Sequence, residues 1–190
     1  AILVLFGSRH ENQTTIFYER ELKDLIDVGH KEGVLEEEER ALIHNILKFN
    51  DTPVFSIMTP YSTMFTLSND LSIEQAIKQA KKHPFSRIPV YKGEKNNIIG
   101  ILNVKDLLAI NFKPDRKTSS IESILRPPHF VVQDRRIHVV LKEFKGEKIH
   151  LALVVNKANK VIGLVTIEDV LEELFGEIYD EFDAVIKREK

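Results

Sequence analysis

The chain has 190 residues, of which 43% are hydrophobic and 29% charged, and its formal net charge is −2. This is the composition of ordinary globular protein, sufficient for one domain of moderate size or two small ones. No basic stripe with interleaved aromatic residues occurs, so nothing points to a nucleic-acid partner. Cysteine is absent, which excludes disulfides, thiolate metal sites and a cysteine nucleophile. The sequence contains no run of about 18 or more apolar residues, so it predicts no membrane-spanning helix.

The first part of the chain predicts an N-terminal extension, residues 1–15, and an acidic helical segment, residues 16–53. Residues 1–6 are apolar and fit either the stub of a longer membrane segment or a buried strand. Two apolar stripes with helical spacing follow, comprising Phe17, Leu22, Leu25 and Ile26, and then Leu42, Ile43, Ile46 and Leu47. Between them, Glu36–Glu39 predict a solvated helix start, because carboxylates in a first turn are stabilised by the helix dipole. The alternative is an acidic face that meets a basic partner or a cation.

An internal repeat organises the rest of the chain. The segment Ile98–Leu108 recurs 63 residues later as Val161–Leu171. The matching positions pair Gly100 with Gly163, Asn103 with Thr166 and Asp106 with Asp169. Each copy predicts a strand, a helix, two strands and a helix. The predicted boundaries are 54–112 and 121–176 for the two copies, 113–120 for a linker and 177–190 for a C-terminal helix or linker.

The upstream part of each copy repeats as well. An apolar strand follows a proline in both, Met64–Leu67 in the first copy and Phe130–Val132 in the second. An amphipathic helix is predicted after each strand, beginning after Asp70 and Asp134 respectively. A unit of about 60 residues makes a marginal core by itself. The two copies are therefore expected to share an interface within an α/β (α+β) fold.

Motifs for most catalytic chemistries are absent. The sequence contains no G-x-x-x-x-G-K-[ST], no G-x-G-x-x-G, no H-E-x-x-H and no G-x-S-x-G. The seven histidines show no metal-ligand spacing with one another, so no metal site is predicted. We therefore expect no catalytic residues and a protein that is not an enzyme.

The repeated Asn/Thr-x-x-Asp motif has two interpretations. Thr166 and Asp169 have the spacing of a capping box, and Asn103 with Asp106 has the same spacing. At a helix start after a buried strand, however, free N–H groups would also bind phosphate, and the carboxylate would accept ribose hydroxyls. The segment Ile88–Val90, held extended by its central proline, would supply an apolar slot for adenine. The residues alone leave both plain capping and an adenine-nucleotide site open.

Four stretches of sequence together resemble a known family. They are Gly33–Glu39, Ile57–Pro60, Ser86–Tyr91 and Gly163–Leu174, and the last runs on into Gly176–Ile178 and Asp180–Asp183. The paired copies resemble two CBS motifs, β-α-β-β-α modules named for cystathionine β-synthase, whose tandem pairs are called Bateman modules. The combination resembles more specifically the CorC/CNNM family of magnesium and cobalt transport proteins, which includes hemolysin C-like members. The resemblance covers about residues 18–183.

The resemblance implies a nucleotide in the cleft between the two CBS motifs, usually ATP with magnesium, with AMP or ADP as alternatives. The implied contacts are Phe85, Ser86, Arg87, Ile88 and Pro89 on the adenine side, and Thr59, Thr166, Glu168 and Asp169 on the ribose and phosphate side. Arg87 is expected either to contact phosphate or to pair with an acid of the partner copy.

The resemblance also implies a pseudo-symmetric second site that would use Asn103, Asp106 and His150. We expect this site to be weak or empty. The reason is that His150–Ala152 replaces Arg87–Pro89 there, and Asn103 replaces Thr166.

The family setting implies a cytoplasmic regulatory module of a divalent-cation transport protein, at the cytoplasmic side of the cell membrane. A transmembrane domain, missing from this chain, would carry out transport, and the CBS motifs would form a two-fold homodimer. The nucleotide would shift the population of module conformations, and the acidic helices would pass that shift on. The alternative is a structural dimerisation module without a ligand.

Overall fold

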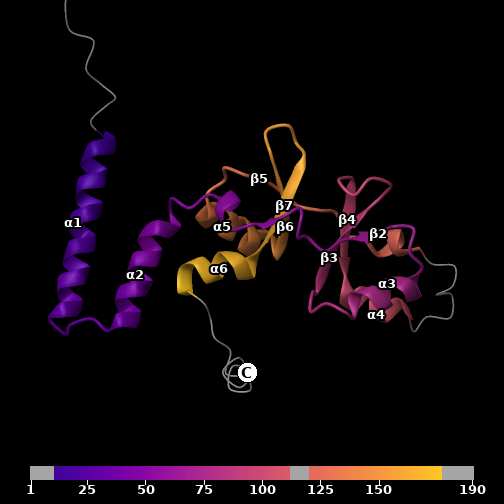
Figure 1. Cartoon of the computed structure of the whole chain (residues 1–190), viewed down its shortest axis with the longest axis horizontal. Coiled ribbons are helices and arrows are strands. Elements are labelled where there is room, and N and C mark those ends of the chain that lie inside the picture. Colours follow the sequence, from indigo (N-terminus) through magenta and orange to yellow (C-terminus); the bar gives the residue numbers. More distant parts are fainter. Residues whose placement is uncertain (1–10, 112–119, 177–190) are drawn as a thin grey trace, which may run out of the picture. The chain divides into compact units, whose positions relative to one another are not determined.

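The computed structural model describes residues 11–111 and 120–176 (Figure 1). These residues divide into two compact units: the chain up to Thr52 together with the residues from Leu171 onward, and Pro53–Val170. The apolar start at 1–6, most of the predicted linker and the stretch 177–190 lie outside the described residues. Within the described part, no helix combines the length and apolar character needed to cross a membrane.

The first unit contains the helices α1 (Glu11–Lys31) and α2 (Glu37–Phe49). Glu36 is the N-cap of α2, and its backbone N–H donates to the Glu39 carboxylate at 3.0 Å in a capping box. The glutamates of the first turn are exposed. This confirms that the acidic run is a solvated helix start.

The predicted apolar stripes of this unit are only partly buried. Ile26 and Phe49 are buried, whereas Leu22, Leu25 and Ile46 stay 45%, 68% and 45% exposed. The end of α6, which belongs to the same unit, also contacts α2, where Asn45 donates to the Leu174 carbonyl at 3.4 Å.

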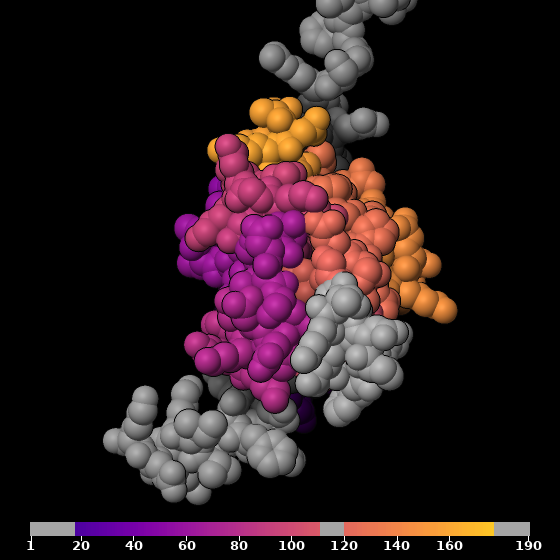
Figure 2. Space-filling view, turned by 90° about the vertical axis from the view of Figure 1, so that its right-hand side faces the viewer, coloured from indigo at the N-terminus to yellow at the C-terminus, as the bar shows by residue number. Residues whose placement is uncertain are grey.

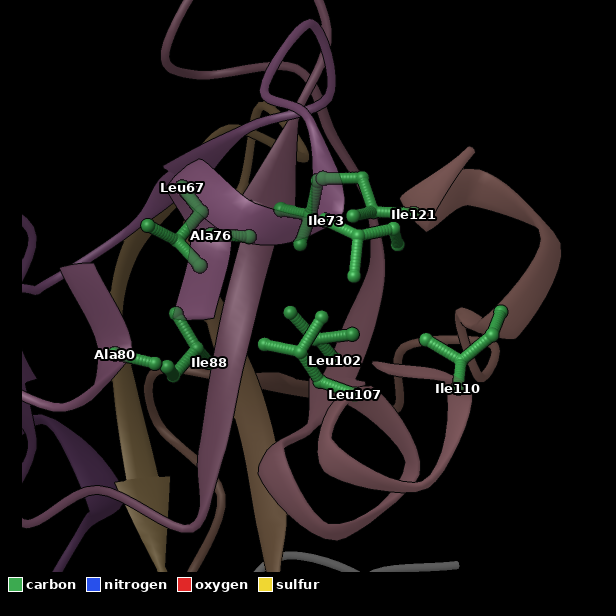
Figure 3. Packing of buried hydrophobic residues seen from close by; sticks show 10 residues of the cluster. Leu67, Ile73, Ala76, Ala80, Ile88, Leu102, Leu107, Ile110 and Ile121 are labelled. Atoms are coloured by element: carbon green, nitrogen blue, oxygen red, sulfur yellow. The ribbon is translucent and has the colours of Figure 1, made fainter. Parts of the chain in front are cut away.

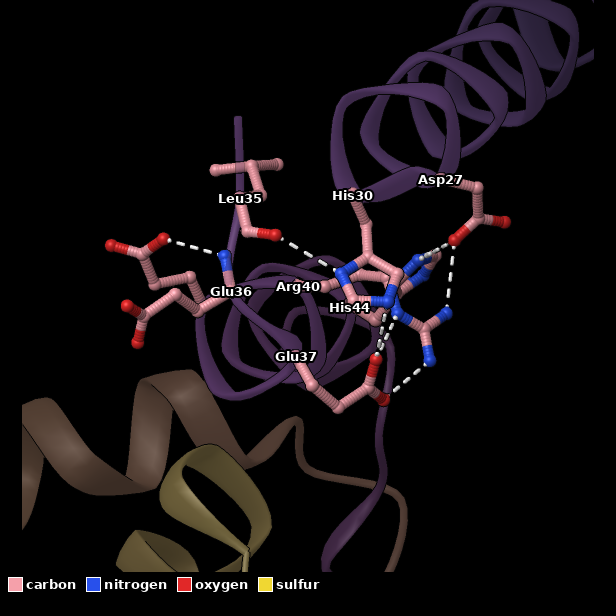
Figure 4. Close-up of polar contacts among 8 residues, drawn as sticks. Asp27, His30, Leu35, Glu36, Glu37, Arg40 and His44 are labelled. Atoms are coloured by element: carbon pink, nitrogen blue, oxygen red, sulfur yellow. Dashed lines mark hydrogen bonds and ion pairs between the residues drawn. The ribbon is translucent and has the colours of Figure 1, made fainter. Parts of the chain in front are cut away.

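A charged network joins α1 to the beginning of α2 (Figure 4). Arg40 donates through Nη1 to Asp27 Oδ1 at 3.0 Å and through Nη2 to Glu37 Oε1 at 2.6 Å. His44 Nε2 lies 3.1 Å from the same oxygen of Asp27. The hydrogen bond from Arg40 lowers the pKa of Asp27, helped by His44, and a second bond from Arg40 lowers the pKa of Glu37. The two helices are thus held together by charge-assisted bonds as well as by apolar contact.

The second unit contains the two copies of the repeat, with their elements in the predicted order. The first copy comprises η1 (Val54–Ser56), β1 (Thr59–Pro60), β2 (Leu67–Ser68), α3 (Ile73–Ala80), β3 (Arg87–Tyr91), β4 (Ile98–Asn103) and α4 (Val104–Asn111). The second comprises η2 (Ile121–Ile124), β5 (Phe130–Val132), α5 (Ile137–Glu147), β6 (Leu151–Val155), β7 (Val161–Thr166) and α6 (Ile167–Phe175), whose end belongs to the first unit. The predicted tandem β-α-β-β-α architecture is confirmed.

Some element boundaries differ from the prediction. The strand expected at Met64–Leu67 is the short β2, and Met64 is buried instead in the core between the copies. Helix α3 is capped by Ser72, whose hydroxyl accepts from the Gln75 N–H at 3.2 Å, rather than beginning after Asp70. A serine whose partner stands at the third helical position completes a capping box, and this local bond sets the helix start.

The strands form two sheets that exchange their first segments. The sheet orders are β2-β3-β4 and β1-β7-β6-β5, so β1 of the first copy pairs antiparallel with β7 of the second. Reciprocally, Arg126 of the second copy forms a bridge with Ile101 of β4. In the space-filling view, the coral residues that begin the second copy lie against the magenta surface of the first (Figure 2). The segment leading into each motif therefore lies on the last strand of the other motif.

The repeated glycines permit this exchange. A Cβ at Gly163 would overlap the carbonyl oxygen of Thr59 and lie 3.0 Å from the Met58 sulfur. A Cβ at Gly100 would lie 2.8 Å from the Cβ of Leu125. Glycine is therefore required at the same place in both copies because another chain segment approaches the backbone closely.

Apolar clusters within and between the copies hold this unit together. Helices α3 and α4 cover one face of the first sheet, where Leu67, Ile73, Ile88, Leu102 and Leu107 are among the buried residues (Figure 3). A second cluster joins the copies, and its buried members are Met64, Ile98, Ile101, Leu151, Leu153, Val155 and Val161. Each fully buried Leu, Ile or Val side chain contributes about 1.5–3 kcal/mol. The predicted shared interface between the copies is confirmed by this second cluster.

The two copies do not align at a single offset. Arg87 lies opposite Asn103 in the β3–β4 ladder, whereas Leu151 lies opposite Thr166 in the β6–β7 ladder. Because Asn103 and Thr166 correspond, Arg87 corresponds to Leu151. The connection between β6 and β7 is one residue shorter than that between β3 and β4, and this shifts the upstream strands.

The prediction that His150–Ala152 replaces Arg87–Pro89 is therefore wrong. Ser86 is the counterpart of His150, because the carbonyls of both accept a hydrogen bond from the first residue of the following helix, α4 or α6. Leu153 takes the place of the proline.

Candidate functional site

A cavity of about 400 Å³ lies between the two copies, at the ends of β3 and β6. Its lining residues are Thr59, Thr63, Met64, Phe65, Pro84, Phe85, Ser86, Arg87, Pro89, His150, Leu151, Leu164, Thr166, Glu168 and Asp169. Every residue expected on the two sides of the first site lines this cavity except Ile88. Because β1 crosses to β7, Thr59 comes to the same wall as Thr166.

Ile88 lies elsewhere. Its side chain is fully buried in the core under α3 and α4, since neighbouring residues of a strand point to opposite faces. The apolar slot expected from Ile88–Val90 is therefore formed on this face by Pro89, together with Phe65 and Phe85.

Thr166 and Asp169 form a closed capping box in the cavity wall. Asp169 Oδ2 accepts from the Thr166 N–H at 2.7 Å and from the Thr166 hydroxyl at 2.8 Å, while the Asp169 N–H donates to that hydroxyl at 3.2 Å. Two of these bonds are accepted by the same carboxylate oxygen of Asp169, and the third is accepted by the Thr166 hydroxyl. The box therefore fixes the carboxylate at the start of α6 while the residue still lines the cavity.

An open strand edge borders the same cavity. Strand β2 pairs with β3 only at Val90 and Tyr91. In the second copy the corresponding ladder runs further, and the Leu153 N–H donates to the His129 carbonyl at 2.8 Å. Pro89, at the place of Leu153, has no N–H to donate. The proline therefore ends the β2 ladder early and leaves this edge of β3 beside the cavity.

An aromatic group forms the outer part of the slot. The rings of Phe65 and Phe85 have centroids 6.0 Å apart, and both residues line the cavity. His83 stacks on Phe85 at 5.6 Å with an interplanar angle of 8° and lies 4.0 Å from Phe65. Phe85 remains 46% exposed, so its ring is available to stack on a flat ligand. Phe65 is not among the residues expected at this site, because the apolar stretch that contains it predicts only a strand.

Basic and acidic residues lie on different walls of this cavity. Arg87 and His150 lie at the strand ends, and Glu168 and Asp169 lie at the beginning of α6. Among the residues that the structure describes, no side chain pairs with the Arg87 guanidinium.

A second cavity, of about 410 Å³, is related to the first by the repeat. Its lining residues are Arg87, Ile101, Asn103, Arg126, Pro127, Pro128, His129, Glu147, Lys148, Ile149, His150 and Leu151. The expected second capping box is not formed. Asn103 Oδ1 accepts from the Lys105 N–H at 3.3 Å, but Asp106 is bonded to Arg126 instead, at 2.8 and 3.2 Å. A guanidinium offers a carboxylate stronger, charge-assisted bonds than a neutral N–H does.

Comparison with known proteins defines the class of this molecule. Residues 54–112 and 121–176 match the CBS domain, and the chain belongs to the CBS domain family as a tandem pair. The particular kind of CBS pair follows from the relatives. The chain is 38% identical to the CBS domain of a bacterial CNNM/CorC family Mg²⁺ transporter, with a TM-score of 0.78 over 85% of this chain and 98% of that one. A structure of such a domain in complex with ATP is 39% identical, with a TM-score of 0.68, over 72% of this chain and 96% of that one.

The chain is also similar in sequence to longer proteins. The chain is 35% identical over 163 residues to the magnesium and cobalt efflux protein CorC of Escherichia coli, which covers 86% of this chain and 56% of CorC. It is 33% identical over 186 residues to the UPF0053 protein YrkA of Bacillus subtilis, covering 96% of this chain and 43% of YrkA. The chain thus spans about half the length of these relatives. Its CBS pair is one of the CNNM/CorC kind.

Proposed function

We propose that the chain binds an adenine nucleotide in the first cavity, with ATP and magnesium as the foremost ligand and ADP or AMP as alternatives. On this proposal it is the regulatory module of a CorC/CNNM-like divalent-cation transport protein, and it performs no catalysis. The observation that carries the proposal is the convergence of three features on one cavity: an aromatic slot, an open strand edge and a capped carboxylate at a helix start.

Each part of a nucleotide matches the chemistry of one wall of the first cavity. Adenine fits between Phe85 and the edge of β3 at Pro89, where its ring stacks and its polar edge meets backbone groups. Asp169 accepts from the ribose hydroxyls, and the positive end of the α6 dipole attracts phosphate. Arg87 adds a positive charge that phosphate can reach. The volume of about 400 Å³ lies in the usual range for small-molecule sites.

Magnesium would arrive with the nucleotide. Within residues 11–111 and 120–176, no group of three or more His, Asp or Glu side chains is placed to hold a metal ion. Mg²⁺ commonly binds through phosphate oxygens, water and only one or two carboxylates. Glu168, which lines the cavity beside Asp169, is the carboxylate positioned to contribute.

Regulation follows from linkage between the cavity and the rest of the transporter. A nucleotide that bridges the two CBS motifs stabilises one arrangement of the pair, and its binding energy shifts the population toward that arrangement. The transmembrane domain, the position at the cytoplasmic side of the membrane and the homodimer through the CBS motifs belong to the same proposal. The acidic helices α1 and α2 would connect the module to the membrane domain.

Thermal unfolding and calorimetry with ATP, ADP and AMP, each with and without magnesium, test this function. We expect one nucleotide per protomer. At 100 times its dissociation constant, a ligand that binds only the folded chain adds about 2.7 kcal/mol of stability, which raises the melting temperature measurably. If millimolar nucleotide leaves the melting temperature unchanged while sedimentation shows a dimer, the chain is a structural dimerisation module instead.

A further inference from the structure

The two cavities are related by the repeat, yet their acidic residues are placed differently. Asp169 lines the first cavity, whereas its counterpart Asp106 is not among the described residues that line the second. Arg126 lines the second cavity and donates through Nε and Nη2 to Asp106 Oδ2, at 3.2 and 2.8 Å. The carboxylate needed for ribose is therefore already engaged by an arginine.

The structural counterpart of Arg126 in the first cavity is Thr59. Thr59 lies opposite Leu164 of β7, and Arg126 lies opposite Ile101 of β4, at matching positions of the repeat. Both residues precede a proline. One position thus carries a short hydroxyl beside the first cavity and a long guanidinium beside the second.

We propose that Arg126 determines which of the two cavities takes the nucleotide, by covering and neutralising Asp106 in the second. This inference rests on the proposed nucleotide-binding function. A ribose would have to displace two charge-assisted bonds before it could use that carboxylate. In the first cavity, Thr59 has no charge and leaves Asp169 on the wall.

The ion pair between Arg126 and Asp106 can be removed by mutation without loss of the fold. The side chain of Arg126 is 63% exposed and that of Asp106 is 36% exposed. Ion pairs of this exposure add little to folding stability, because water and salt screen them. The Arg126→Thr variant, which copies Thr59, should therefore fold normally and leave the first cavity unaltered.

The second cavity differs from the first in one further respect, which removal of Arg126 does not change. The hydrogen bond from the Leu153 N–H to the His129 carbonyl continues the β5–β6 ladder at the place where Pro89 interrupts the β2–β3 ladder. No open strand edge is therefore offered to adenine. A nucleotide admitted by removal of Arg126 should bind more weakly than the one in the first cavity.

Calorimetric titration of the full chain with ATP and magnesium tests the inference, combined with NMR shifts of the Val104–Asp106 amides at the start of α4. Wild type should bind one nucleotide without moving these amides. Arg126→Thr should add a second event, about 10-fold or more weaker than the first, that moves them. The double variant Arg126→Thr/Asp106→Asn should lose the second event. The reciprocal Thr59→Arg should weaken the first event at least about 10-fold, because the new guanidinium can pair with Asp169.

The outcomes separate this inference from the proposed function. One event in both wild type and Arg126→Thr, with the Val104–Asp106 amides unmoved, overturns the role of Arg126 and leaves the first site standing. No event in wild type but one in Arg126→Thr supports the role of Arg126 and overturns the assignment of the first cavity. No event in either chain overturns both.

Discussion

At the scale of single residues, a side chain that fixes a helix start also lines the first cavity. Asp169 closes a capping box with Thr166 through three hydrogen bonds and also lines the first cavity. Capping and nucleotide binding are therefore compatible at this helix start. Only a measurement that separates stability from affinity can distinguish capping alone from capping with binding.

Replacing Asp169 by Asn should weaken nucleotide binding strongly. Loss of hydrogen bonds from ribose to a charged acceptor costs about 1.5–3 kcal/mol, which corresponds to about 10- to 150-fold in affinity. Calorimetry of Asp169→Asn measures this loss, and Asp106→Asn is the matched control because Asp106 does not line the first cavity. Capping without binding predicts instead a slightly lower stability and nearly unchanged affinity. Equal losses in both variants would show that the site is misplaced or that both cavities bind.

The close approach at Gly163 gives a second residue-scale prediction. A methyl group there would overlap the Thr59 carbonyl, so Gly163→Ala should lower the free energy of unfolding by about 1–3 kcal/mol or more. Gly146 is the matched control: it lies in α5, and a Cβ there meets nothing within 4 Å. Gly146→Ala should be neutral or stabilising, by up to about 1 kcal/mol, because alanine favours the helix. Urea denaturation measures both, and equal stabilities would contradict the close crossing of β1 over β7.

At the scale of elements, short local signals start the helices and long-range pairings finish the site. Ser72 and Glu36 begin α3 and α2 through bonds within one helical turn. Pro89 acts on a larger element by ending the β2–β3 ladder early. A single residue without an N–H thus gives the first cavity an edge that the second lacks.

The network between α1 and α2 predicts acid sensitivity of this helix pair. The pKa values of Asp27 and Glu37 are lowered in the folded chain, first of all by hydrogen bonds from Arg40. Both carboxylates therefore bind fewer protons when folded than when unfolded. Their stabilising contribution is complete above the unfolded pKa values, near 4, and is lost as pH falls through the lower folded values.

Hydrogen exchange of the amides in α1 and α2 measures this effect. Their protection should fall as pH decreases from about 5 to 3, after correction for intrinsic exchange rates. Arg40→Gln should remove most of that pH dependence. Lys23→Gln should not, because Lys23 forms only an exposed pair with Glu19 one turn away. An identical pH response in wild type and Arg40→Gln would contradict the role of the network.

At the scale of the whole molecule, segment exchange joins two motifs that each bury residues of their own, such as Ile88 in the first and Phe144 in the second. Each motif of about 60 residues is small for an independent core. The cluster that joins the copies contains buried residues of both, including Ile101 and Leu153. The first cavity lies along the same junction. A ligand there contacts both motifs, which is the property that a population-shifting module requires.

The sequence by itself determined the features that depend on neighbouring residues. The repeat, the order of strands and helices, the acidic helix start at Glu36 and the capping box at Thr166 all follow from local spacing and composition. Most residues expected at the first cavity also line it, because the two strand ends and the helix start are fixed by their own motifs. These predictions need only alternation, helical period and capping chemistry.

Only the tertiary structure decided the features that join residues far apart in the chain. The crossing of Thr59 to β7, the burial of Ile88 in the helix-covered core and the pairing of Arg126 with Asp106 all depend on how the two copies exchange segments. The one-residue shift between Arg87 and Leu151 comes from a shorter connection, which repeat spacing does not reveal. Local sequence rules describe one strand or helix at a time. The engagement of Asp106 depends instead on a guanidinium brought from the other copy.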